Sequence, residues 1–139
     1  MFSDCKKLSD ISPLKNWNVS LVKNFDRLFC GCSSIDGIKP LENWNFSNGK
    51  NLSYMFCGCS LLNDLKPIEN WNVYNCKDFS SMFAYLELLT DVSPLKKWNV
   101  SNGEKFGKMF RGCKSLKNGN VLKSWKFSKN IDFQSMFTN

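Results

Sequence analysis

The residues best suited to chemistry in this chain of 139 residues are its seven cysteines, because the chain contains no histidine. Histidine is the commonest metal ligand and general base near neutral pH, so its absence argues against most metal centres and acid–base mechanisms. Cys5, Cys32, Cys59 and Cys113 are spaced by multiples of 27 residues, and Leu86 takes the one missing position. A position that accepts both Cys and Leu is packed and apolar. We therefore interpret Cys32 and Cys59 as structural residues.

Cys30 and Cys57 share a second repeat position, so stacked repeats would make them neighbours. A step of about 4.8 Å between copies lies within the Cα separation of a disulfide, so a bridge is possible. The two Cys-Gly-Cys segments also suggest a soft-metal site, although zinc ligands are usually two to four residues apart and often include histidine. The odd number of cysteines favours reduced thiols and an intracellular or virion-associated protein. We predict no metal and no cofactor.

Asp10, Asp64 and Asp91 also share one repeat position, which Gly37 and Asn118 interrupt. A column of like charges could attract a cation or a basic partner, but such a column is more often a solvated edge. The glycines follow the repeat and form no phosphate-binding loop. We therefore expect a protein that is not an enzyme.

All these spacings come from a repeat of 27 residues that covers the whole chain. A fixed period in this range predicts stacked units with one continuous core rather than a globule with a single cleft. We expect one domain with repeats at residues 1–27, 28–54, 55–81, 82–108 and 109–135 and a partial sixth at 136–139. The aromatic ladders expected in its core are Trp17, Trp44, Trp71, Trp98 and Trp125, with Phe29, Phe56, Phe83 and Phe110.

In the first four repeats, the segment of the form Leu-x-x-Leu-x-Pro predicts a short strand, because proline lacks an N–H and stops strand pairing. The fifth repeat has Gly119 and Val121 at the second leucine and the proline, and a strand is expected there as well. The apolar spacing of Phe25, Leu28 and Phe29 is i, i+3, i+4, which predicts a short helical turn on the convex side. The expected fold class is α/β: a leucine-rich-repeat solenoid with one short parallel strand per 27-residue repeat and short helical or irregular convex segments. The strands are expected at residues 8–12, 35–39, 62–66, 89–93 and 116–120.

The repeat resembles a known type. The motif Met-Phe-Cys-Gly-Cys-Ser at residues 55–60 and the motif Asp-Val-Ser-Pro-Leu-Lys-Lys-Trp-Asn-Val-Ser-Asn at residues 91–102 carry the resemblance. They are similar to BspA-type leucine-rich repeats, in the variant described from mycoplasma-like lipoproteins and also found in bacterial, protist and large-DNA-virus proteins. The resemblance implies a solenoid used for binding, most often adhesion or host interaction, and it implies no catalytic residues.

The candidate binding residues lie between the leucines of the expected strands and would face outward along the inner curve. Nucleic-acid binding is not expected, because the aromatic residues belong to the core and the chain has only two arginines. No segment approaches the roughly 18 apolar residues of a membrane span, so we expect no membrane insertion, and no signal peptide is visible. The candidate residues are Asp10, Ser12, Lys39, Asp64, Lys66, Asp91, Ser93, Asn118 and Asn120.

The formal net charge of +7, with lysines spread along the repeats, favours weak attraction to acidic partners. Three functions follow as hypotheses. The first is a non-enzymatic scaffold that mediates protein–protein interaction. The second is a structural assembly component, for example of a virion or shell, that joins copies of itself end to end through the solenoid ends. The third is a fragment of a surface adhesin.

Overall fold

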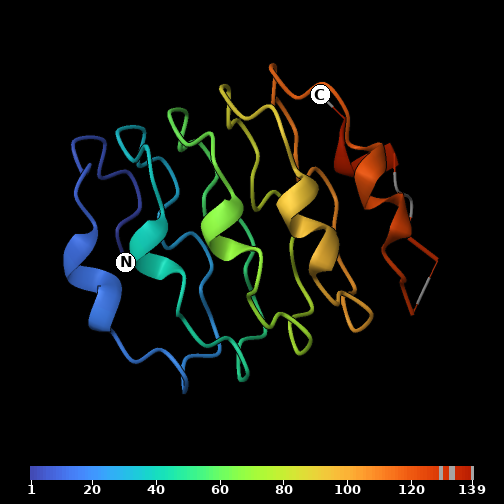
Figure 1. Ribbon diagram of the computed structural model, residues 1–139, viewed down its shortest axis with the longest axis horizontal. Helices are drawn as coiled ribbons and strands as arrows, with labels where there is room; N and C mark the ends of the chain where they lie inside the picture. The colour runs from blue at the N-terminus through green and yellow to red at the C-terminus, as the bar shows by residue number, and fades with distance from the viewer. Residues whose placement is uncertain (129, 132–133, 139) are drawn as a thin grey trace.

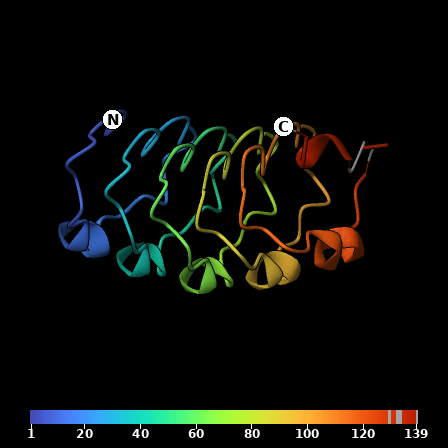
Figure 2. The ribbon, with the colours of Figure 1, turned by 90° about the horizontal axis from the view of Figure 1, so that it is seen from above.

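The computed structural model describes residues 1–128, 130–131 and 134–138. The chain winds into a row of coils, one for each repeat, and the coils follow one another along the row in sequence order (Figure 1). Seen from above, the 3-10 helices of the five coils lie along one side of the row (Figure 2). These helices are η1 Ser12–Asn16, η2 Lys39–Leu41, η3 Lys66–Ile68, η4 Ser93–Lys97 and η5 Asn120–Ser124, and η6 follows at Gln134–Met136.

The expected α/β solenoid with parallel strands is wrong. Among the described residues, the only parallel pairing consists of isolated bridges, which join Asn24 to Asn51, Asn51 to Asp78, and Asp78 to Lys105. Each predicted strand is instead an irregular segment that leads into the 3-10 helix of its coil. The segments concerned are residues 8–12, 35–39, 62–66, 89–93 and 116–120.

In four of the five coils, an Asx turn at the start of the 3-10 helix favours the helix over a strand, whereas the second coil forms η2 with Gly37 at that position. In the fourth coil, Oδ1 of Asp91 accepts a hydrogen bond from the backbone N–H of Ser93 at 2.8 Å, which closes an Asx turn. Pro94 then occupies the first turn of η4, where a missing N–H is tolerated because that donor has no partner within the helix. The proline therefore begins a helix rather than ending a strand. Asp10, Asp64 and Asn118 close the same turn at 2.8 Å.

The hydrogen bonds that join the coils lie in the turn-rich segments, which we call the ladder side. The N–H groups of Phe25, Arg27, Phe29 and Gly31 donate to carbonyl groups of the next coil at distances of 2.7–3.0 Å. The intervening N–H groups close local turns, as Leu28 does with the carbonyl of Phe25 at 3.2 Å. The helical turn expected at Phe25, Leu28 and Phe29 is therefore a series of β-turns.

This alternation places two residues of each coil in the left-handed conformation. Arg27 has a φ of 52° and Gly31 a φ of 75°, and one repeat later Tyr54 and Gly58 have 55° and 76°. Each residue is the third of a β-turn, where type II geometry requires a positive φ. Glycine adopts this conformation without a Cβ clash, which explains the glycine of the Met-Phe-x-Gly-Cys motif.

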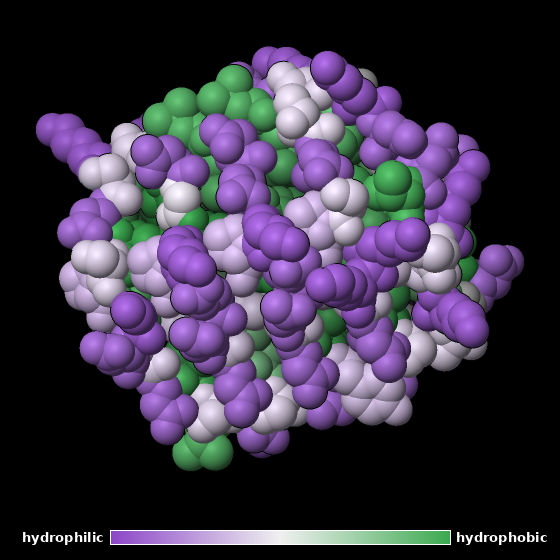
Figure 3. Space-filling model, in the orientation of Figure 1, coloured by the Kyte–Doolittle hydropathy of each residue, from purple (hydrophilic) through white to green (hydrophobic). Residues whose placement is uncertain are grey.

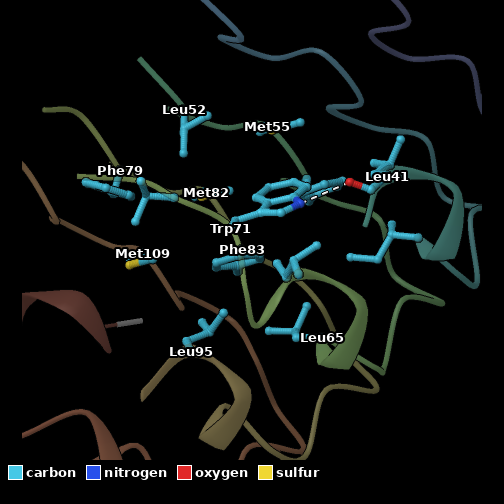
Figure 4. Close-up of a cluster of buried hydrophobic side chains, with 14 of the residues drawn as sticks. Leu41, Leu52, Met55, Leu65, Trp71, Phe79, Met82, Phe83, Leu95 and Met109 are labelled. Carbon is cyan, nitrogen blue, oxygen red and sulfur yellow. Dashed lines mark hydrogen bonds between the residues drawn. The ribbon is translucent and has the colours of Figure 1, made fainter. Parts of the chain in front are cut away.

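The core fills the space between the helices and the ladder side (Figure 4). Phenylalanine rings stack coil upon coil from Phe2 to Phe137, with neighbouring ring centroids 5.2–6.0 Å apart and planes within 14°. The indole Nε1–H of Trp71 donates to the carbonyl of Leu41 in the preceding coil at 3.0 Å (dashed line in Figure 4). Trp44, Trp98 and Trp125 make the equivalent bond to Leu14, Ile68 and Leu95 at 2.9–3.1 Å.

Candidate interaction surface

The candidate surface is the exposed side of the row of 3-10 helices, which we call the helix face. Hydrophilic side chains cover most of it (Figure 3). A hollow of about 370 Å³ between η2 and η3 is lined by Lys39, Asp64 and Lys66 together with Glu42 and Glu69. The structure thus brings three of the predicted binding residues together.

The predicted binding residues lie around the starts of the 3-10 helices rather than on strands. Four of them accept the backbone N–H of the residue two positions later, so they also have a structural role. Hydrogen bonds from the side chain and backbone of Ser12 lower the pKa of Asp10. The four are Asp10, Asp64, Asp91 and Asn118. The others, at the first position of a helix, are Ser12, Lys39, Lys66, Ser93 and Asn120.

Ion pairs neutralise the helix face around the second and third coils. Nζ of Lys66 lies 2.9 Å from Oε2 of Glu69, and Nζ of Lys97 lies 3.2 Å from the same atom. Hydrogen bonds from these two lysines lower the pKa of Glu69. Lys39 pairs with Glu42 in the same way. The hollow between η2 and η3 is therefore mixed in sign and largely paired within itself.

A second hollow, of about 380 Å³, lies between the fourth and fifth coils and differs in charge. Lys96, Lys97 and Lys126 line it together with uncharged polar residues and two tryptophans. Lys123, which is exposed on η5, precedes a serine that also lines the hollow. We call these four lysines the basic cluster. Within the described part of the chain, Lys97 alone among them has an ion-pair partner, Glu69.

The basic cluster belongs to a region whose formal charge exceeds the net charge of +7 of the whole chain. Residues 93–126 contain nine lysines and arginines and a single acid, Glu104, whereas residues 1–92 contain nine basic and ten acidic residues. Treating the lysines as evenly spread along the repeats missed this asymmetry. A charge count made repeat by repeat would have found it in the sequence.

Equivalent positions of the coils show the same change residue by residue. Lys96 and Lys123 occupy the position that holds Glu42 and Glu69 in the second and third coils. Lys126 occupies the position at which the other coils have an asparagine that closes an Asx turn. The charge at the Lys96 position is therefore positive in the first coil, at Lys15, negative in the second and third coils, and positive again in the fourth and fifth.

Three of the cysteines, Cys32, Cys59 and Cys113, donate a hydrogen bond from Sγ to a backbone carbonyl of the preceding coil. All seven are free, and Sγ of Cys59 donates to the carbonyl of Phe29 in the preceding coil at 3.2 Å. Burial raises the pKa of Cys59, and burial is also the main cause that raises the pKa of Cys57, beside Cys30, to about 12. Thiols held protonated in this way are weak nucleophiles. Among the residues that the structure describes, no group of cysteines and carboxylates is arranged to hold a metal ion.

The comparisons with known proteins give one match. A family described as "Mycoplasma protein of unknown function, DUF285" matches residues 1–115 and 38–139, which together cover the chain. No curated protein and no solved structure matches the chain. The family match fits the resemblance to mycoplasma repeat proteins and carries no activity. In the described residues, no helix has the length and apolar character of a membrane span.

Proposed function

We propose that this chain, which belongs to the family described as Mycoplasma protein of unknown function, DUF285, is a non-enzymatic repeat scaffold that mediates protein–protein interaction. The proposed binding surface is the helix face. The observation that carries the proposal is that buried positions of the repeat keep their residue type from coil to coil, whereas exposed positions on the helix face change. The tryptophan position is the same in all five coils, whereas the position that begins each 3-10 helix changes, through Ser12, Lys39, Lys66, Ser93 and Asn120.

Many repeat proteins present an extended binding surface in this way: their repeats stack on a common core, and the exposed residues differ between repeats. Here the frame is held by hydrogen bonds between the coils and by stacked phenylalanine rings, so the exposed side chains keep fixed places relative to one another. Kinship with BspA-type repeats is part of the same proposal and is supported by the repeated motif. It does not include the parallel-strand architecture.

Site-specific crosslinking tests this function. A photoreactive amino acid would replace Lys66 on the helix face or, as the control, Lys105 on the ladder side; both positions are exposed. Each variant is irradiated in an extract of cells that produce the protein, and trapped proteins are identified by mass spectrometry. We expect a specific partner at position 66 that also binds the chain when purified. Trapping at position 105 alone, or the same proteins at both positions, would contradict the proposal.

A second candidate function is assembly through the ends of the row. Trp17 in the first coil is 43% exposed, whereas the other four tryptophans are 3–6% exposed. Around it lies an apolar hollow of about 260 Å³, lined mainly by Phe2, Leu8, Ile11 and Leu14. In later coils the preceding coil covers the equivalent residues. The first coil thus has a face suited to another coil, and a second copy of the chain could supply one.

Sedimentation velocity across a concentration series, in reducing buffer, tests end-to-end assembly. The wild type should form dimers or longer species as its concentration rises, and Trp17→Gln should shift this association to higher concentration. A wild type that stays monomeric throughout would exclude this candidate.

A further inference from the structure

We propose that the hollow between the fourth and fifth coils binds an acidic segment of a partner protein, held by the basic cluster of Lys96, Lys97, Lys123 and Lys126. This inference rests on the proposed interaction function and adds the location of the contact and the chemistry of the partner.

The first argument is uncompensated charge. In the described residues, Lys96, Lys123 and Lys126 have no ion-pair partner, and the acid that pairs with Lys97 belongs to the third coil. Positive charges gathered around one hollow repel one another and raise the local concentration of anions. Carboxylates placed in the hollow would relieve that repulsion, and exposed charges of this kind steer the encounter of two proteins.

The second argument is that the fold does not require these lysines. Glu42 and Glu69 occupy the position of Lys96 and Lys123. The 3-10 helix is shorter in the coils with glutamate, three residues against five, but the tryptophan N–H closes the same turn in all four coils, so either sign of charge is compatible with the stacking. In the fourth coil, Asn99 accepts the backbone N–H of Ser101 at 3.2 Å. The side chain of lysine cannot accept a hydrogen bond, so Lys126 cannot close the equivalent Asx turn in the fifth coil. A basic residue that replaces a structural one suggests a role outside the frame.

The third argument favours a protein segment over nucleic acid. Trp98 and Trp125, which line the hollow, are only 3% and 6% exposed, so they offer no ring face on which bases could stack. Arg111 does not line the hollow, and its guanidinium lies over the ring of Tyr85, 5.8 Å from the centroid. In the next hollow along the face, Lys39 and Lys66 are paired with Glu42 and Glu69, so no basic track continues along the row for a phosphate backbone. A short acidic segment fits within the single basic hollow.

Fluorescence anisotropy with two labelled probes tests the inference: a ten-residue peptide of alternating Asp and Glu, and a single-stranded 20-mer DNA. The test variant is Lys96→Glu, Lys123→Glu, Lys126→Asn. The control variant is Lys6→Glu, Lys7→Ser, Lys15→Glu in the first coil. Both variants lower the net charge by the same amount. Every new residue already occurs at the same position in another coil, so both should keep the near-UV circular dichroism of the wild type.

We expect the wild type to bind the acidic peptide, the test variant to bind it about tenfold more weakly, and the control to stay within about threefold of the wild type. Equal weakening in both variants would overturn the inference, because binding would then follow net charge alone. No peptide binding by the wild type at 50 mM salt, or tighter binding of DNA that the test variant loses, would also overturn it. None of these results would affect specific crosslinking at position 66. The proposed scaffold function and the proposed site for an acidic segment can therefore fail independently.

Discussion

Replacing Trp71 with alanine should cost much more stability than replacing Trp17, although both residues occupy the same repeat position. Trp71 is 4% exposed and its Nε1–H bonds to the carbonyl of Leu41, whereas Trp17 is 43% exposed on the outer side of the first coil. Truncating a buried tryptophan costs about 3–5 kcal/mol, and the lost hydrogen bond contributes about 1 kcal/mol. Scaled by its buried share, Trp17→Ala should cost only about 2–3 kcal/mol.

Urea unfolding followed by near-UV circular dichroism gives the free energy of unfolding for each variant. Because Trp71 lies between two coils, its loss should also weaken the coupling between the halves of the row and broaden the transition. Trp71→Phe, which keeps a ring but loses the N–H, should fall between the wild type and Trp71→Ala. Equal costs for Trp17→Ala and Trp71→Ala would refute the reasoning.

Three further changes test the frame. Gly112→Ala should destabilise by about 2 kcal/mol or more, because Gly112 has a φ of 68° and a Cβ would lie 2.5 Å from the ring of Tyr85; Gly58→Ala, which has only the φ cost, should lose about 1 kcal/mol. Tyr85→Gly should rescue the first variant and not the second in thermal melts. Burial raises the pKa of Cys76 to about 12, so the unfolded thiol ionises first and stability should fall as the pH rises from about 8.5 towards 12. The free energy of unfolding, measured in urea at pH 8 and 10.5, should fall less between these two pH values in Cys76→Ala than in the wild type. An equal fall in the two proteins would contradict this expectation. Asp91→Ala should cost about 1 kcal/mol at pH 7 by removing the Asx turn. Hydrogen bonds from Ser93 lower the pKa of Asp91, so its contribution is present above the pKa of the unfolded carboxyl and lost as the pH falls through the lower native value. Urea unfolding at pH 6 and pH 3 measures this, and an unchanged difference between variant and wild type would count against it.

Sequence spacing indicates which side chains meet, but not the path of the backbone within a coil. A core shared by stacked copies needs the same residue in each copy, so the spacing places Phe56 against Phe29 and Phe83. Pro94, in contrast, suits both the end of a strand and the first turn of a helix. In the fourth coil the side chain of Asp91 accepts the N–H of Ser93 and favours the start of η4. The second coil forms η2 with Gly37 at the equivalent position, so this turn is not needed in every coil.

Sequence spacing is also insufficient to predict the backbone of the ladder side and the position of the basic cluster on the surface. Apolar residues at i, i+3 and i+4 fit a helical turn, but Arg27 and Gly31 have positive φ, which breaks the helix and turns alternate N–H groups towards the next coil. No periodicity of hydrophobic residues reveals that. The basic cluster follows from charge counted by repeat, yet only the structure shows that Lys96 and Lys126 line one hollow.

The same hydrogen bonds between neighbouring coils recur one repeat later along the row, so the length of the molecule can change in whole repeats. If residues 55–81 were deleted, the indole of Trp98 would meet the carbonyl of Leu41, the acceptor that Trp71 uses now. Phe83 would stack on Phe29, and the basic cluster would move one coil closer to the first. Gain or loss of a coil can therefore change the distance between two contact points on the surface without redesigning either one.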